Sequence, residues 1–253
     1  MVIIATQCFQ SIQGLCLRLT RLDTCCQPPS AGTPNSLVVS DSFISLGLTA
    51  ELEEPDEFTL KLANGKLCIN EIGCATLKRY TVEITLCNAD PDLFEIVGGV
   101  SKVLDFKGDA VGYEIDQDLG SCGKFSMEFW TRVPTDQCLP GEESKYVYWL
   151  LPCLQNGRVG DITIENGPLE FSFTADAIPS HAWGRGPYNV VPLSLGDQVG
   201  GSLLAPIGCN TALHVQTTTV PPPCQSDPSC VTGAVDDDDC GVKVMPVAPN
   251  VLA

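Results

Sequence analysis

Hydrophobic and polar residues alternate along much of this chain, which is the pattern of β-strands with one buried and one solvent-facing side. The segment from residue 79 to residue 86 is the clearest case. Its hydrophobic positions are Tyr80, Val82, Ile84 and Leu86, and its polar positions are Arg79, Thr81, Glu83 and Thr85. Further strands are predicted over residues 44–50, 58–62, 111–115, 125–132, 146–154, 162–165 and 169–175. Short strands in this number predict a mainly β protein, either a β-sandwich or a β-barrel.

One helix is predicted directly after the strand that ends at residue 86. Asn88 or Asp90 provides the N-cap, Pro91 takes the first helical position, and Gly98 and Gly99 end the helix. Its hydrophobic side consists of Leu93, Phe94 and Val97. The chain is therefore expected to form a β-sandwich or β-barrel flanked by a single α-helix.

The strands at residues 44–50 and 58–62 are predicted to pair as a hairpin. Their connection is the acidic segment 51–57 (ELEEPDE), which holds five carboxylates and one proline. Such a segment projects into water, crosses to a partner or lines a cavity. The dipeptide Asn64-Gly65 predicts a tight turn that leads into the next strand.

The predicted organisation is one β-domain over residues 1–220, followed by an appendage over residues 221–253. The domain includes a loop at 24–36 that is rich in Cys, Pro and Gly, and an ordered loop at 181–188. The appendage follows the segment TTTVPPP and contains four consecutive aspartates at 236–239. We expect it either to extend into solvent or to dock on a neighbouring molecule.

The charge of the chain restricts its partners. A formal net charge of −17 argues against a specific grip on nucleic acid, because such a grip needs clustered Lys and Arg. The sequence has no apolar run of membrane-spanning length, and its first residues lack the basic flank of a signal peptide. We therefore expect neither a membrane span nor a leader.

The fourteen cysteines show no C-x-x-C spacing, and two histidines are too few for an ordinary zinc knuckle. Most of the cysteines are predicted to be small, buried, free thiols. A disulfide between Cys224 and Cys230 is a hypothesis for the late Pro- and Asp-rich turn, and adjacent Cys25 and Cys26 are a weaker candidate pair.

Catalytic motifs are absent from the sequence. It contains no G-x-S-x-G, H-E-x-x-H, P-loop or G-x-G-x-x-G motif, so we expect no enzyme, no cofactor and no bound metal. An enzyme would need a pocket that brings His181 or His214 beside a nucleophile. His214, between Leu and Val, is more typical of a structural residue.

A collinear set of motifs resembles the major tail tube protein of long, flexible-tailed bacteriophages that infect actinobacteria. The motifs are FTLKLANGKLC at 58–68, LKRYTVEITLC at 77–87, DPDLF at 90–94, Gly98-Gly99, FSMEFWT at 125–131, YWLLP at 148–152, IENGP at 164–168 and WGRGPY at 183–188. The resemblance covers roughly residues 40–192.

The resemblance implies a structural virion protein with the tail tube fold. Six copies would form a ring, and rings would stack into a tube that surrounds the tape measure protein and conducts DNA during ejection. Its partners would be itself, the tape measure protein, the tail terminator and distal tail or baseplate proteins. It would be assembled in the host cytoplasm and located in the virion, with DNA passing through the lumen unbound.

The resemblance also assigns roles to acidic residues. Because charges are screened beyond about 8 Å at physiological salt, only carboxylates that face the lumen would repel DNA and prevent it from binding to the tube wall. Glu83 and Glu170 are the lumen-facing candidates. The candidates for contacts between rings are Glu51, Glu53, Glu54, Asp56 and Glu57.

An alternative hypothesis from another class is a secreted β-sandwich held together by disulfides, which binds a protein or a glycan. Trp183 or Tyr188 would then recognise the sugar. Free thiols favour the phage subunit, and pairing of nearly all cysteines favours the secreted module.

Overall fold

The computed structural model shows a mainly β protein with antiparallel sheets and, within the described residues, a single α-helix. It describes residues 11, 13–30, 37–87, 91–115, 123–134, 146–160, 162, 170–193, 200–223 and 242–245. The early elements are β1 (Gln13–Leu22), β2 (Leu37–Ser40), β3 (Phe43–Glu53), β4 (Glu57–Lys61), β5 (Leu67–Ile72), β6 (Thr76–Leu86) and α1 (Pro91–Gly98). The later elements are β7 (Ser101–Leu104), β8 (Ala110–Glu114), β9 (Lys124–Arg132), β10 (Tyr146–Val159), β11 (Phe171–Ala177), β12 (Val191–Pro192), β13 (Gly200–Gly201), β14 (His214–Thr218) and β15 (Val242–Met245).

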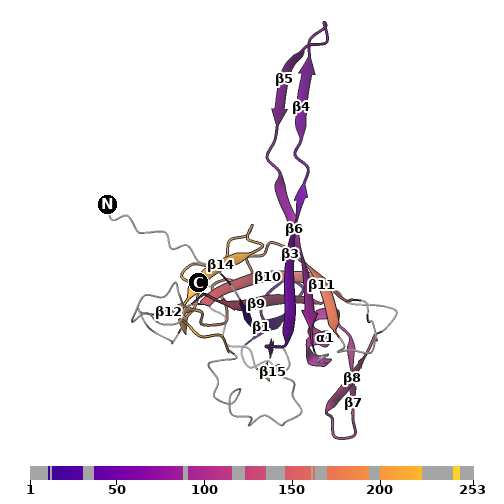
Figure 1. The fold of residues 1–253 in the computed structure, drawn as a ribbon, viewed down its shortest axis with the longest axis vertical. Helices are drawn as coiled ribbons and strands as arrows, with labels where there is room; N and C mark the ends of the chain where they lie inside the picture. Colours follow the sequence, from indigo (N-terminus) through magenta and orange to yellow (C-terminus); the bar gives the residue numbers. More distant parts are fainter. Residues whose placement is uncertain are drawn as a thin grey trace.

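Most strands join one nine-stranded sheet with the order β15-β2-β1-β9-β10-β11-β6-β3, and β14 also pairs with β10 (Figure 1). The sheet curls back on itself. A Cβ atom at Gly14 of β1 would lie only 2.3 Å from Cζ of Phe43, at the start of β3. The first and last parts of the sheet therefore enclose a common interior.

The centre of the sheet is buried on both faces, because neighbouring residues of one strand enter different cores. Leu17 belongs to a core that also contains residues of β6, β9, β10, β11 and α1. Cys16 belongs to a second core on the other face. That second core is covered by residues 178–193 and 200–207, which contribute Trp183, Tyr188 and Leu203.

The helix prediction is confirmed. Helix α1 begins at Pro91, buries Leu93, Phe94, Ile96 and Val97, and is followed by Gly99 with a φ of +62°. The predicted cap residues, Asn88 and Asp90, lie outside the described residues. The helix approaches β10 so closely that a Cβ at Gly157 would lie 1.9 Å from the carbonyl oxygen of Val97. Asn156, with a φ of +57°, forms part of an irregularity in β10 at this contact.

The predicted hairpin between residues 44–50 and 58–62 is wrong. β3 pairs with β6, and β4 pairs with β5, so residues 43–61 and 67–86 run side by side as two long halves of one hairpin. Its tip is the predicted Asn64-Gly65 turn, where Gly65 has a φ of +81°. We call residues 51–79 the arm; it projects far beyond the sheet (Figure 1).

The other predicted strands are found in β6, β8, β9, β10 and β11. Of the prediction at residues 162–165, only residue 162 is described. A second hairpin, β7–β8, projects from the opposite end to the arm (Figure 1). The domain boundary at residue 220 stays a prediction, but the structure adds that β15, from the predicted appendage, pairs with β2.

A buried ion pair lies between the central strands β1 and β9. The Arg18 guanidinium donates from Nε and Nη2 to the two carboxylate oxygens of Glu128, at 2.6 and 2.5 Å. Tyr148 donates its hydroxyl to the same carboxylate at 2.6 Å. The guanidinium also stacks on the ring of Tyr188, 3.6 Å from its centroid. Burial alone would lower the pKa of Arg18, but the Glu128 carboxylate outweighs it and raises that pKa.

In the described part of the chain most cysteines are free, as predicted, but the prediction that the free thiols are buried is wrong. The candidate pair Cys25–Cys26 is also wrong, because Cys25 is free. The buried Cys26 and Cys153 form a disulfide across 127 residues of sequence, and buried Cys16 is also disulfide-bonded. The described free thiols are all exposed: Cys25, Cys68, Cys74, Cys87 and Cys209. The predicted Cys224–Cys230 pair lies outside the described residues.

Candidate functional site

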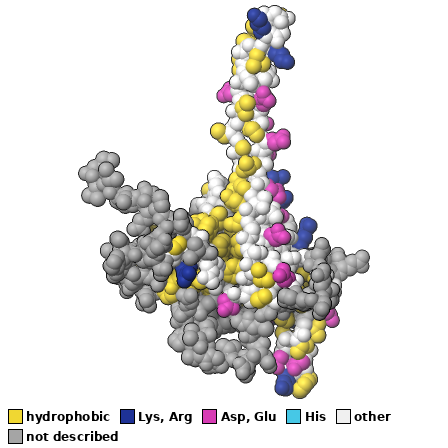
Figure 2. Space-filling view, in the orientation of Figure 1, with side chains coloured by type: hydrophobic (Ala, Val, Ile, Leu, Met, Phe, Trp, Pro, Cys, Tyr) yellow, Lys and Arg dark blue, Asp and Glu magenta, His cyan; other side chains and the backbone are white. Residues whose placement is uncertain are grey.

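The arm exposes a concentration of large hydrophobic side chains. Phe58 and Ile72 are 62% and 61% exposed, although residues of this kind are ordinarily buried. The other exposed hydrophobic residues of the arm are Leu52, Leu60, Leu62, Leu67, Ile69 and Leu77. Figure 2 shows these hydrophobic surfaces along the arm, with acidic side chains beside them and lysines near the tip. Exposed apolar patches of this kind mark interaction sites.

The cross-strand register places several of these residues on one face. Leu60 lies opposite Ile69, and Phe58 is two residues before Leu60, so all three share a face of the β4–β5 ladder. Thr59 lies opposite Asn70 on the other face. The arm thus carries an apolar face and a more polar one over its outer half.

Hydrogen bonds hold the arm in its extended shape. At the tip, the Gly65 N–H donates to the Leu62 carbonyl at 2.8 Å, and the Lys66 N–H donates to Oδ1 of Asn64 at 3.0 Å. At the break between β3 and β4, the Gly73 N–H donates to the Asp56 carbonyl at 2.9 Å. Pro55 lacks an N–H, which explains why the ladder is interrupted there.

A polar network fixes the root of the arm to the sheet. Arg79 of β6 donates to Glu51 of β3 at 2.7 Å and to Asp176 of β11 at 3.3 Å. Asp176 also accepts from the side-chain amide of Asn156 at 2.9 Å, and Glu51 accepts from the Thr81 hydroxyl at 2.9 Å. Hydrogen bonds from Arg79 and Thr81 lower the pKa of the half-buried Glu51 carboxyl.

The five acidic residues predicted for contacts between rings do not form a hairpin loop. Glu51 and Glu53 lie at the end of β3, Glu54 and Asp56 lie in the break between β3 and β4, and Glu57 begins β4. Four of them are exposed, and Glu51 is half-buried by its ion pair with Arg79. They therefore line the lower half of the arm.

The two predicted lumen-facing carboxylates lie on connected strands. Glu83 of β6 is exposed between Gly47 of β3 and Thr174 of β11, which are both small residues. Glu170 is exposed immediately before β11, in step with Ser172 and Thr174. Within the described residues Glu83 and Glu170 form no ion pair. The polar side of β3, β6 and β11 therefore presents carboxylates without compensating cations at those two positions.

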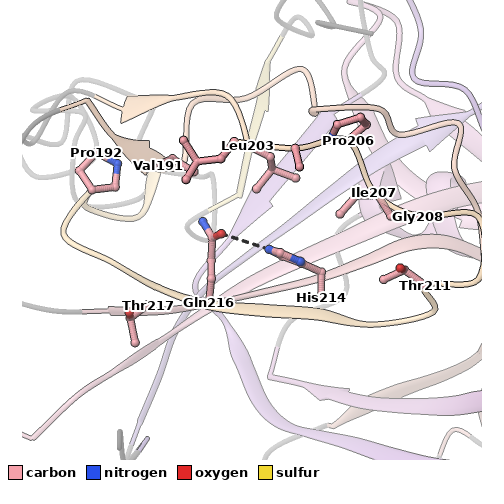
Figure 3. Close-up of a pocket in the computed structure, with 12 residues that line it drawn as sticks. Val191, Pro192, Leu203, Pro206, Ile207, Gly208, Thr211, His214, Gln216 and Thr217 are labelled. Carbon is pink, nitrogen blue, oxygen red and sulfur yellow. Dashed lines mark hydrogen bonds between the residues drawn. The ribbon is translucent and has the colours of Figure 1, made fainter. Parts of the chain in front are cut away.

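A pocket lies beside β14, with a volume of about 650 Å³ (Figure 3). Val191, Leu203, Pro206 and Ile207 form its apolar wall. His214 and Gln216 point into it from β14 and bond to each other at 3.1 Å. No described nucleophile hydrogen-bonds to His214, and His181 is outside the pocket lining. The pocket does not assemble the base and nucleophile that an enzyme of this kind would need.

The two aromatic residues of the glycan hypothesis are buried. Trp183 is 1% exposed and Tyr188 is 8% exposed, because both enter the second core. The predicted loop at 181–188 is ordered by turns in which the Gly184 and Gly186 N–H groups donate to the carbonyls of His181 and Trp183. The prediction that these two rings recognise a sugar is therefore wrong.

The described residues offer neither a metal site nor a helix that could span a membrane. They contain no group of three His, Cys, Asp or Glu side chains that could hold a metal ion. They also contain no helix with the length and apolar character needed to cross a bilayer.

No protein-family model matches the sequence, and no curated protein matches it significantly. The function of this protein must therefore be inferred from its own surfaces.

The exposed apolar surface of the arm was not predicted from the sequence. The available signal was the symmetry about Asn64-Gly65, because similar alternating segments extend for many residues on both sides of this turn. The role of Arg79 was also missed, since its two partners, Glu51 and Asp176, come from strands that are distant in sequence.

Proposed function

We propose that this protein is the structural subunit of a self-assembled tube, of the kind formed by the tail tube proteins of flexible-tailed bacteriophages. The observation that carries the proposal is the arm, which projects from a well-packed sheet and exposes Phe58, Leu60 and Ile69 on one face. Exposed apolar surfaces of this kind mark interaction sites, because a partner that covers them removes apolar area from water.

A second copy of the chain is the partner that we favour. The outer edge of β3 has no strand paired to it within the described residues, and it offers a row of backbone donors and acceptors over eleven residues. An open edge at one side of the sheet and an arm at one end allow two different contacts. Strand pairing would join neighbours within a ring, and the arm would join successive rings.

The acidic residues fit a tube that conducts DNA. Glu83 and Glu170, on the polar side of β6 and beside β11, would face the lumen and repel the phosphate backbone. Glu53, Glu54, Asp56 and Glu57 would lie where the arm meets the next ring. The tail terminator, distal tail proteins and the tape measure protein would be the remaining partners in the virion.

Light scattering of the purified chain tests the role of the arm. The variant Phe58→Thr/Leu60→Thr keeps β-forming residues but removes two apolar contacts, and we expect assembly to require at least tenfold more protein. The control Thr59→Ser/Asn70→Ser changes the opposite face of the same ladder and should assemble like the unaltered chain. Equal assembly by both variants would contradict the proposal.

The disulfide between Cys26 and Cys153 favours one second candidate, a secreted β-sandwich that binds a protein ligand through the arm. The five exposed free thiols argue in the other direction, because secreted domains seldom retain them. Thiol titration of the native chain, with and without reductant, distinguishes these functions. Pairing of all these thiols within a monomer would favour the secreted module.

A further inference from the structure

The hairpin β7–β8 is a second projecting apolar surface. Phe106, at its turn, is 93% exposed, and Leu104, Val111 and Ile115 are each more than half exposed. No sequence motif marks this hairpin as functional, and it lies far from both the arm and the pocket (Figure 1). A fully exposed Phe at a loop tip is a common form of interface anchor.

The turn that presents Phe106 is well ordered. The Asp105 N–H donates to the Asp109 carbonyl at 2.8 Å, and the Gly108 N–H donates to the Asp105 carbonyl at 3.1 Å. The Asp105 carboxylate accepts from the N–H groups of Lys107 and Asp109 at 2.7 and 2.9 Å. These bonds fix the backbone on both sides of Phe106, so its exposure is a property of the turn.

The root of the hairpin is anchored on the helix. Tyr113 stacks on Phe94 with ring centroids 4.9 Å apart, and Lys102 forms ion pairs with Asp92 and Glu95 of α1. These pairs outweigh the burial of Lys102 and raise its pKa. A hairpin held in this way can present its tip without a large loss of conformational entropy on binding.

The hairpin and the arm lie at opposite ends of the molecule (Figure 1). Neither surface can cover the other within one copy, but a head-to-tail arrangement brings the arm of one copy to the β7–β8 hairpin of the next. Such heterologous contacts continue from copy to copy and produce rings or filaments.

The charges of the two tips are complementary. Between Phe58 and Asn70 the charged residues are Lys61 and Lys66, and the next charged residues toward the sheet are Glu57 and Glu71. The turn of the other hairpin has two carboxylates, Asp105 and Asp109, and one cation, Lys107, whose ammonium lies 5.7 Å from the centroid of the Phe106 ring. The end of the arm is therefore positive and the turn has a net charge of −1, which favours their approach.

We propose that the β7–β8 hairpin is the receptor for the arm of a neighbouring copy of this chain. In this contact Phe106 and Leu104 pack on the apolar face formed by Phe58, Leu60 and Ile69, and Lys66 at the tip of the arm approaches Asp105 and Asp109. The inference rests on the proposed function, because it identifies the surface that receives the arm in the assembled tube.

The first test is the variant Leu104→Thr/Phe106→Thr of the full chain, compared by light scattering with the unaltered protein. We expect at least a tenfold rise in the concentration needed for assembly. Leu193→Thr is the matched control, since Leu193 is 68% exposed and lies outside both hairpins. Circular dichroism should show the same unfolding temperature for all three proteins.

The second test locates the contact by cross-linking. Cys68 of β5 provides an exposed thiol on the arm, and Lys107→Cys places a second thiol on the other hairpin while Phe106 stays in place. We combine this change with serine at positions 25, 74, 87 and 209, and add a short bis-maleimide to the assembled protein. Mass spectrometry should identify a link between position 68 of one copy and position 107 of another, and Leu193→Cys in the same background should give none.

The outcomes separate the two proposals. If the unaltered chain assembles, but the Leu104→Thr/Phe106→Thr variant assembles equally well and no link forms between positions 68 and 107, the receptor is elsewhere and the tube proposal stands. If the unaltered chain is strictly monomeric at high concentration, both proposals are overturned.

Discussion

The centre of the sheet and the arm both alternate hydrophobic and polar residues, but the centre buries its hydrophobic side chains and the arm exposes them. In the centre, Cys16 and Leu17 enter different cores, and even the ion pair of Arg18 and Glu128 is buried. In the arm, Phe58 and Ile69 stay exposed on a two-stranded ladder that no described residue covers. The comparison indicates that burial in the sheet stabilises the fold, whereas we propose that the arm serves assembly.

The largest expected effect on stability comes from the centre. Glu128→Ala leaves the Arg18 guanidinium buried without its carboxylate and also removes the acceptor of the Tyr148 hydroxyl. We expect the free energy of unfolding to fall by about 3–5 kcal/mol in urea denaturation. The double variant Arg18→Met/Glu128→Leu should lose much less, because it removes both charges. A loss below about 1 kcal/mol for Glu128→Ala would contradict the distinction between the two regions.

High pH should weaken the same centre. Burial, together with the nearby Glu128 carboxylate and despite Arg18, raises the pKa of Tyr188 to about 12. Above pH 10 the unfolded chain releases this proton first, so the free energy of unfolding falls as pH rises from 10 to 12. Two pKa units correspond to about 2–3 kcal/mol. Urea denaturation at several pH values should show a smaller fall for Tyr188→Phe, and an equal fall would contradict this origin.

Gly157→Ala tests the contact between the helix and β10. The added Cβ would meet the Val97 carbonyl at 1.9 Å, so the helix must shift outward. We expect a loss of about 1–3 kcal/mol in thermal or urea unfolding. Gly112→Ala is the control, because the nearest atom to its Cβ is 3.9 Å away. Similar stabilities for both variants would show that the helix is not packed as described.

Features that depend on neighbouring residues in the chain could be predicted from the sequence, whereas features that depend on the order of strands in the sheet could not. Alternation and capping residues correctly indicated strand β6, helix α1 and the Asn64-Gly65 turn, because each depends on neighbours in the chain. The partner of β3 could not be obtained in this way. The same alternation suits pairing with β4 or with β6, and only the assembled sheet selects β6.

The cysteines and the polar network show the same limitation. Cys26 and Cys153 meet because the sheet brings distant strands together, which no spacing pattern indicates. Arg79 was correctly placed on the polar side of its strand, but its bonds to Glu51 and Asp176 depend on strand order. The assembly roles of Glu83 and Glu170 stay predictions.

The smallest expected effect on stability is at the root of the arm. Arg79→Gln removes two partly exposed ion pairs, with Glu51 and Asp176, which should change the free energy of unfolding only slightly because solvent screens them. The pKa of Glu51 should nevertheless rise toward its ordinary value, because its hydrogen bond from Arg79 lowers it. Carbon-detected NMR titration of that carboxyl measures the change, with Lys66→Gln, at the tip of the arm, as the control. An unchanged pKa would mean that Arg79 does not hold the root of the arm.

Negative-stain electron microscopy of the purified, full chain at high concentration tests the central claim most directly. The account predicts rings with a central channel, or tubes formed by their stacking, through the arm and the open edge of β3. A field of single, separate particles at every concentration, with no rings or tubes, would contradict it.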